Sequence, residues 1–96
     1  MVGMLQSIDG IRVMSNKESG DGRFDMILYP DNIDDKVIII ECKHSKQLKG
    51  LREDARKALQ QIQEKRYEEA VINEGYERHI GYGISFYKKQ CYVVVE

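Results

Sequence analysis

The sequence is poor in the residues and segments that mark several classes of protein. Its 96 residues include one proline and no low-complexity tract, and 42% of them are hydrophobic. This composition is typical of a single folded globular domain and argues against a disordered chain. The longest apolar run, from Val37 to Ile40, is far too short to cross a bilayer. No basic stretch followed by an apolar core opens the chain, so we expect no secretory signal.

Cysteine is scarce as well. The two cysteines, Cys42 and Cys91, lie far apart and neither belongs to a Cys-x-x-Cys pair. A zinc knuckle and a redox motif are therefore not indicated. Both residues fall in apolar, strand-like runs, where a free cysteine usually behaves as a small buried hydrophobe. We expect a reduced, cytoplasmic protein.

The sequence also lacks a large excess of either charge, because its formal net charge is −1. The distribution is more informative than the sum, since residues 43–66 hold 8 basic and 3 acidic side chains. A basic segment beside an acidic pocket suits an enzyme that binds phosphate and a divalent cation. The alternative is a solvated helix face with ion pairs four residues apart. The candidate nucleic-acid-binding residues are Arg23, Lys46, Lys49, Arg52 and Arg56.

Hydrophobic periodicity predicts an α/β domain with one mixed sheet and one long helix. We expect residues 1–9 to be the last turns of a helix ending near Gly10, and residues 50–73 to be helical up to a stop at Gly75. The helix has an apolar stripe at Leu48, Leu51, Ala55, Ala58, Leu59 and Ile62. The predicted strands are 11–14, 24–29, 37–43, 79–87 and 91–95.

The third predicted strand carries an anomaly. It opens with four consecutive β-branched residues, from Val37 to Ile40, which predict a central strand buried on both faces. Glu41 and Lys43 follow, and a period of two places them on one face. Ionic side chains at the end of a buried strand are costly unless they are paired, bound to a metal or in contact with water.

A second acid is expected beside them. If the loop 30–36 closes a hairpin with Tyr29 opposite Val37, then Asp25 lies opposite Glu41, with Cβ atoms roughly 5 Å apart. Two carboxylates this close repel each other unless a cation lies between them, and their hard oxygens suit Mg²⁺ or Mn²⁺. Lys43 could then hold the attacking water and offset charge on a phosphorane. The alternative is that Asp25 caps the preceding turn and Glu41 pairs with Lys43 at the surface.

These motifs resemble those of the PD-(D/E)XK nuclease superfamily. The pattern is GDGRFD at residues 20–25, then fifteen residues, then Glu41-Cys42-Lys43. The segments SNKESGDGRFD, ALQQIQEKRY and GYGISFYKKQCYVVV are most similar to the nuclease-like domain found C-terminal to predicted AAA-ATPase-like proteins of bacteria. The resemblance covers residues 15–96 and is far more specific than the tripeptide alone.

The resemblance implies a restriction-endonuclease-like core of αβββαβ topology and Mg²⁺-dependent endonucleolytic hydrolysis of DNA, with Mn²⁺ as a substitute. It implies that Asp25, Glu41 and the backbone carbonyl of Cys42 hold the metal ion and that Lys43 is catalytic. Glu18 could supply a further acid. Related nucleases often carry a glutamine on the following helix, and of Gln60 and Gln61 we choose Gln61 because it flanks the apolar stripe.

The sequence departs from the superfamily at its start. About ten residues precede the first predicted strand, so the first helix of the core is truncated or missing. We therefore expect a fragment of a longer protein, with an N-terminal ATPase domain, or a homodimer in which a partner supplies the helix. The competing functional hypothesis is a non-catalytic module that binds nucleic acid or protein, keeps the nuclease fold and regulates an attached ATPase.

Overall fold

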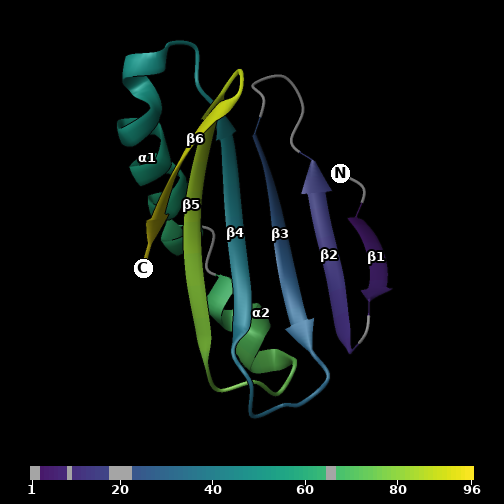
Figure 1. Ribbon diagram of the computed structural model, residues 1–96. Coiled ribbons are helices and arrows are strands. Elements are labelled where there is room, and N and C mark those ends of the chain that lie inside the picture. Colours follow the sequence, from purple (N-terminus) through teal and green to yellow (C-terminus); the bar gives the residue numbers. More distant parts are fainter. Residues whose placement is uncertain (1–2, 9, 18–22, 65–66) are drawn as a thin grey trace.

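A computed structural model gives the fold of the 96-residue chain, and it describes every residue except 1–2, 9, 18–22 and 65–66. Within the described residues, four strands come first, two helices follow, and two strands come last (Figure 1). The elements are β1 (Gly3–Ile8), β2 (Ile11–Lys17), β3 (Arg23–Pro30), β4 (Val37–His44), the 3₁₀ turn η1 (Leu48–Gly50), α1 (Leu51–Glu64), α2 (Tyr67–Asn73), β5 (His79–Tyr87) and β6 (Gln90–Val95).

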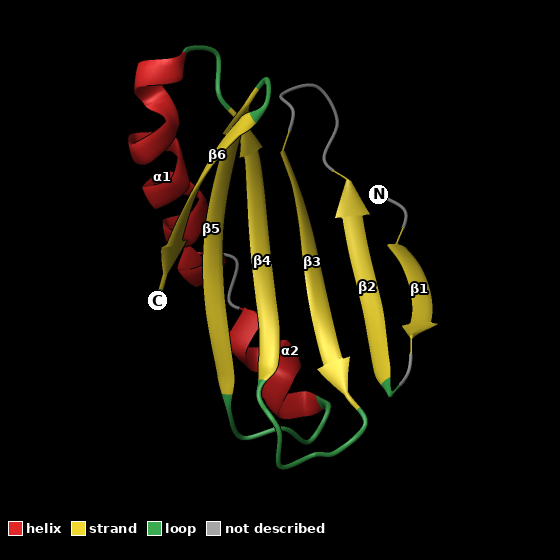
Figure 2. Ribbon diagram, viewed as in Figure 1, coloured by secondary structure: helices red, strands yellow, loops and turns green. Residues whose placement is uncertain are grey.

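The six strands form one sheet in the order β1-β2-β3-β4-β5-β6. Neighbouring strands are antiparallel except β4 and β5, which are parallel and are joined through α1 and α2. Both helices lie on the same face of this mixed sheet (Figure 2). The predicted α/β class, with a mixed sheet and a restriction-endonuclease-like core, is confirmed. Neither described helix is long and apolar enough to cross a membrane.

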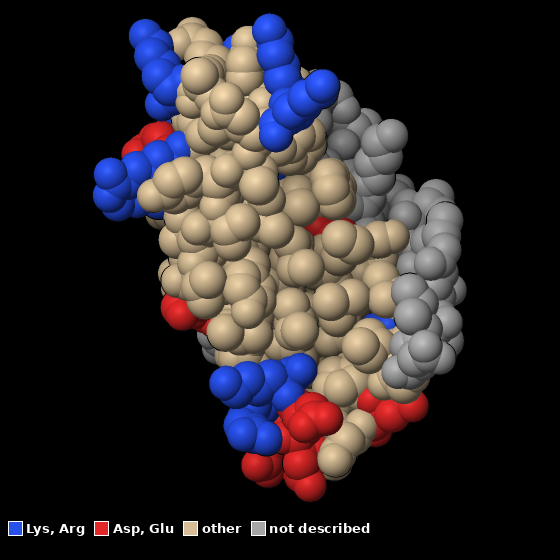
Figure 3. Space-filling model, in the orientation of Figure 1, with Lys and Arg blue, Asp and Glu red and all other residues tan. Residues whose placement is uncertain are grey.

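The two faces of the sheet are covered very differently. The covered face, beneath the helices, carries Asp25, Ile27 and Tyr29 of β3 and Val37, Ile39 and Glu41 of β4, all of them buried. The open face carries the alternate residues Met26, Leu28, Ile38, Ile40, Tyr82 and Ile84, which are half-buried. β4 is central, as predicted, but only its covered face is fully buried. Figure 3 views the sheet from the open face, whose middle is covered mostly by uncharged residues.

The predicted helix at residues 1–9 is wrong, because residues 3–8 form strand β1. This strand pairs with β2 from Gly3↔Asn16 to Ile8↔Ile11. The sequence between the two strands is Asp-Gly, which favours a two-residue hairpin turn, and Gly10 has a φ of +83°. A helix of so few residues is marginal by itself, whereas the edge of β2 offers a full set of backbone partners. The described part of the chain therefore begins with a strand, and a first helix is missing from it.

Helix α1 packs against β4, β5 and β6 through the predicted apolar stripe. Leu51, Ala55, Ala58 and Ile62 are buried, whereas Leu48 lies before the helix and is exposed. Beneath the helix, a Cβ atom on Gly83 would lie 2.2 Å from the carbonyl oxygen of Ala55. Helix and strand backbones therefore touch, and this close approach fixes α1 over the end of β4 that carries the predicted site.

The segment predicted as one helix over 50–73 is two described helices, α1 and α2. Helix α2 ends at Asn73, and the predicted stop, Gly75, follows with a φ of +96°. The amide of Tyr76 donates to the carbonyl of Val71 and that of Gly75 to Ile72. This pair of bonds is a Schellman motif, for which glycine is the preferred residue.

Candidate active site

Asp25 and Glu41 meet on the covered face. The register of β3 and β4 pairs Asp25 with Glu41, which confirms the predicted hairpin. Their exposed fractions are 3% for Asp25 and 1% for Glu41. Carboxylates are almost never buried to this extent unless they are paired, hydrogen-bonded or bound to a metal ion. The two acids are therefore placed at a high cost in desolvation, which is unusual for a structural role.

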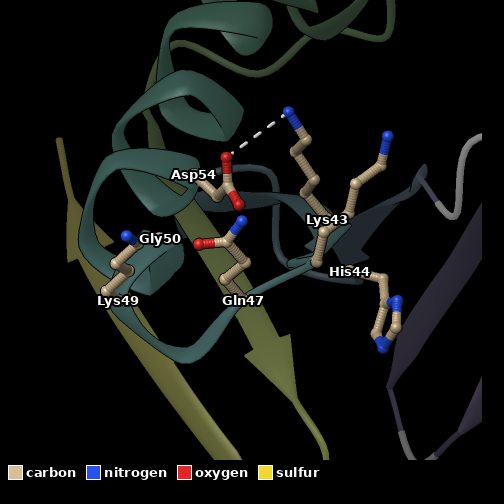
Figure 4. Close-up of a pocket in the computed structure, with 7 residues that line it drawn as sticks. Lys43, His44, Gln47, Lys49, Gly50 and Asp54 are labelled. Atoms are coloured by element: carbon tan, nitrogen blue, oxygen red, sulfur yellow. Dashed lines mark ion pairs between the residues drawn. The ribbon is translucent and has the colours of Figure 1, made fainter.

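Lys43 lies two residues beyond Glu41 on the same strand and reaches toward α1. Its ammonium nitrogen lies 3.5 Å from Oδ1 of Asp54, which comes from the first turn of α1 (Figure 4). No sequence pattern pointed to Asp54, because residues eleven positions apart on a strand and a helix show no common periodicity. The side chain of Lys43 is 30% exposed, so solvent reaches the lysine that follows the two buried acids.

A basic cavity of about 750 Å³ adjoins Lys43. It lies between the end of β4, the turn η1 and the start of α1 (Figure 4). Its lining is rich in cationic side chains, with Lys46 and Lys49 from the predicted nucleic-acid-binding set. The described lining residues are Lys43, His44, Lys46, Gln47, Lys49, Gly50 and Asp54. Arg52 and Arg56 are exposed on α1 and are not among these lining residues.

Comparison with known families agrees with this geometry. The family profile described as the PD-(D/E)XK nuclease superfamily matches residues 1–96, the whole chain. The chain belongs to the PD-(D/E)XK nuclease superfamily. Searches of curated proteins and of solved structures gave no significant match. Membership of a superfamily of nucleases makes the buried acids and the neighbouring lysine the first candidates for its active site.

Gln61 lies near this site, although it does not touch the acids in any described contact. It lines a smaller cavity of about 270 Å³ together with Lys43, Lys57, Ala58 and Gln60. Its amide nitrogen donates to a carboxylate oxygen of Glu64 at 3.2 Å. Gln61 is half-buried and Gln60 is exposed, as the apolar stripe predicted. The choice of Gln61 as the helix glutamine of a superfamily member stays a prediction.

A tyrosine that no sequence pattern singled out also reaches the acidic pair. Tyr67, the first residue of α2, donates a hydrogen bond from its hydroxyl to Oδ2 of Asp25. The residue belongs to the segment ALQQIQEKRY that carries the resemblance, but its position in the helical pattern indicated no role beyond packing in the core. Three elements, β3, β4 and α2, therefore converge on Asp25.

Cys42 lies between the two charged residues of the motif but points to the other side of the sheet. Its burial, and then the negative charges of Glu41 and Asp25, raise the pKa of its thiol to about 11. The thiol is therefore protonated at neutral pH and is a poor metal ligand. If Cys42 contributes to a metal site, the contribution has to come from its backbone carbonyl, as the resemblance implies.

The residues fit a divalent cation of the hard type. Asp25 and Glu41 offer carboxylate oxygens, which Mg²⁺ and Mn²⁺ prefer, and Mg²⁺ keeps several water ligands. Within the described ranges, no group of three or more His, Cys, Asp or Glu side chains is placed to hold a metal ion. Glu18 lies outside the described residues. Arg23 lies opposite Lys43 in the register, and its side chain is outside the described part of the structure.

Proposed function

We propose that this domain is a metal-dependent nuclease that hydrolyses phosphodiester bonds of DNA with Mg²⁺. One observation carries the proposal: two buried carboxylates face each other across neighbouring strands, and a lysine two residues further on opens into a basic cavity. A purely structural core would be more stable with apolar residues in place of Asp25 and Glu41, because buried ionic groups are costly. Their presence is explained by a bound cation.

Each residue has a distinct role in this proposal. Asp25, Glu41 and the Cys42 carbonyl hold the cation, with Glu18 as a further acid. A divalent cation supplies Lewis-acid polarisation of the phosphate and makes a water more acidic. Lys43 holds the attacking water and stabilises the charge that develops on the phosphate oxygens. For this it has to leave Asp54, so the 3.5 Å ion pair describes the domain before substrate binds. Gln61 lines the approach to Lys43.

The basic cavity supports a nucleic acid as substrate. Lys46 and Lys49 are exposed on its rim and can each neutralise a phosphate. Arg52 and Arg56 extend the basic surface along α1 away from the cavity, and Arg23 precedes Asp25 on β3. DNA as the polymer, the homodimer and an attached N-terminal ATPase domain are further predictions that follow from the resemblance and from the small size of the core.

The test is cleavage of supercoiled plasmid DNA with and without Mg²⁺, with an RNA substrate in parallel. We expect Mg²⁺-dependent nicking that EDTA abolishes. Glu41→Ala and Lys43→Ala should each lower the rate by at least about a hundredfold, because each removes a group that stabilises the transition state. The matched controls are Glu77→Ala and Lys36→Ala, which change exposed residues outside strand β4. Wild-type rates in the Lys43→Ala variant would contradict the mechanism.

A non-catalytic module is the second candidate, and the Lys43–Asp54 ion pair favours it. A lysine held by an aspartate of the same domain is not free to act on a phosphate. Titration calorimetry with Mn²⁺ separates the two functions. The nuclease should bind Mn²⁺ and lose this binding in Glu41→Ala. A module that binds nucleic acid or protein and regulates an attached ATPase should bind DNA or a partner without any metal requirement.

A further inference from the structure

The hydrogen bond between Tyr67 and Asp25 joins a helix to one acid of the proposed metal site. Tyr67 comes from α2, whereas the acids come from β3 and β4. Its ring is half-buried and packs against the core cluster that contains Ile27 and Ile39. The ring is therefore held by packing, and its hydroxyl is delivered to Oδ2 of Asp25 in a fixed position.

Such a contact matters because of where Asp25 lies. Directly opposed residues on antiparallel strands have Cβ atoms roughly 5 Å apart, so two ionised carboxylates repel each other and favour turning apart. A hydrogen bond to an ionised carboxylate is stronger than one between neutral groups. A neutral hydroxyl on one oxygen of Asp25 thus restricts the side-chain torsions of the carboxylate, without competing for a cation as a lysine would.

We propose that Tyr67 is a positioning residue for Asp25. Its hydroxyl holds the Asp25 carboxylate in the orientation that a divalent cation shared with Glu41 requires. This inference rests on the proposed function, because it assumes that the two acids bind a metal ion. Groups that orient metal ligands through hydrogen bonds typically change metal affinity by about 10- to 100-fold when they are removed. Tyr67 thus acts before any chemistry, on the affinity for the cation.

The experiment compares two variants that each remove one tyrosine hydroxyl and keep the ring. Tyr67→Phe removes the donor to Asp25. Tyr76→Phe is the matched control, because Tyr76 belongs to the same core and its hydroxyl donates to the backbone carbonyl of Pro30. Titration calorimetry with Mn²⁺ is run on both variants and on the wild type, and circular dichroism verifies that all three are folded.

We expect Tyr67→Phe to weaken Mn²⁺ binding by about 10- to 100-fold, while Tyr76→Phe binds Mn²⁺ as the wild type does. Equal Mn²⁺ affinities in all three proteins would overturn the inference and leave the proposed function intact. A wild type that binds no Mn²⁺ would instead overturn the metal centre itself. The two failures are therefore distinguishable in one set of titrations.

A double variant tests whether Tyr67 acts through Asp25. In the Asp25→Asn background, Tyr67→Phe should cause no further loss of Mn²⁺ affinity, because the carboxylate that the hydroxyl orients is already gone. Residues that act through one shared group show this kind of non-additivity. If the two substitutions instead lower the Mn²⁺ affinity by factors that simply multiply, Tyr67 affects metal binding by another route. This result would contradict its role as a positioning residue.

Discussion

The covered and open faces of the sheet are built from alternate residues of the same strands, yet only one of them carries buried charge. On β4, Ile39 and Glu41 are almost completely buried beneath the helices, while Ile38 and Ile40 are half-buried on the other side. The open face is nevertheless the more uniformly apolar of the two over β3 and β4. Ionic residues are thus concentrated where desolvation is most costly, opposite to the distribution that stability alone favours.

This difference separates the residues that form the core from those that form the candidate site. On the covered face, Ile27, Tyr29, Val37 and Ile39 form the core with residues of both helices. Asp25 and Glu41 continue the same rows of side chains toward the end of β4 where Lys43 meets Asp54. A single layer of helices therefore covers the apolar core at one end of the sheet and the two buried acids of the candidate site at the other.

The largest effect that we expect is on stability, and it tests the packing of the covered face. It comes from Gly83, where this face meets the backbone of α1. In Gly83→Ala the new methyl group would lie 2.2 Å from the Ala55 carbonyl oxygen and 2.5 Å from the Leu59 amide nitrogen. Backbone atoms cannot move aside as a side chain can, so α1 has to lift from the sheet. We expect a loss of at least about 4 kcal/mol, enough to unfold a domain of this size.

Urea denaturation followed by circular dichroism measures this loss. Gly81→Ala is the matched control, because its methyl group would meet only the ends of side chains, with Ile62 at 3.3 Å and Glu96 and Leu59 at 3.5 Å. Wild-type stability in Gly83→Ala would mean that α1 does not press on β5 as described.

A smaller effect on stability compares the two faces directly, through substitutions of two adjacent isoleucines of β4. Ile39→Ala removes a fully buried side chain from the core and should cost about 3–4 kcal/mol in the free energy of unfolding. Ile40→Ala removes a half-buried side chain from the open face and should cost about 1 kcal/mol. Both losses are measured by urea denaturation. Equal losses would show that the open face is as well covered in solution as the face beneath the helices.

Much of this arrangement could be predicted from the sequence, because it depends on local patterns. The two-residue period of a strand, and a hairpin register set by the loop between β3 and β4, were enough to place Asp25 opposite Glu41. The apolar stripe of α1 and the glycine that ends α2 were likewise visible as helical spacing and a stop signal.

The rest depends on contacts between distant segments, which no local pattern reveals. The ion pair of Lys43 with Asp54 and the hydrogen bond of Tyr67 to Asp25 both join a strand to a helix. Strand β1 was misread because its apolar spacing also suits a helix, and the Asp-Gly turn signal was given no weight. Gly83 looked like an ordinary strand residue until α1 was seen to rest on it.

The smallest expected effect concerns the two cysteines, which test how well the open side of the sheet is shielded near the site. Cys42 points to that side, opposite Phe24 in the register, and is 6% exposed, whereas Cys91 on β6 is exposed. Burial and the charges of Glu41 and Asp25 raise the Cys42 pKa from 9.0 to about 11. At pH 8 its thiolate fraction is thus about a hundredfold lower than that of an unshifted thiol.

Iodoacetamide at pH 8 should therefore label Cys91 first, with mass spectrometry locating the modified peptide, and denaturant should equalise the two rates. The raised pKa of Cys42 also determines the direction in which the stability of the folded state changes with pH. The folded state holds the thiol proton more tightly than the unfolded chain, so this contribution is fully present below pH 9.0 and is lost as the pH rises to about 11. A Cys42→Ala variant should lack that part of the alkaline loss. Rapid labelling of Cys42 in the folded protein would show instead that the sheet is open to water directly behind Glu41.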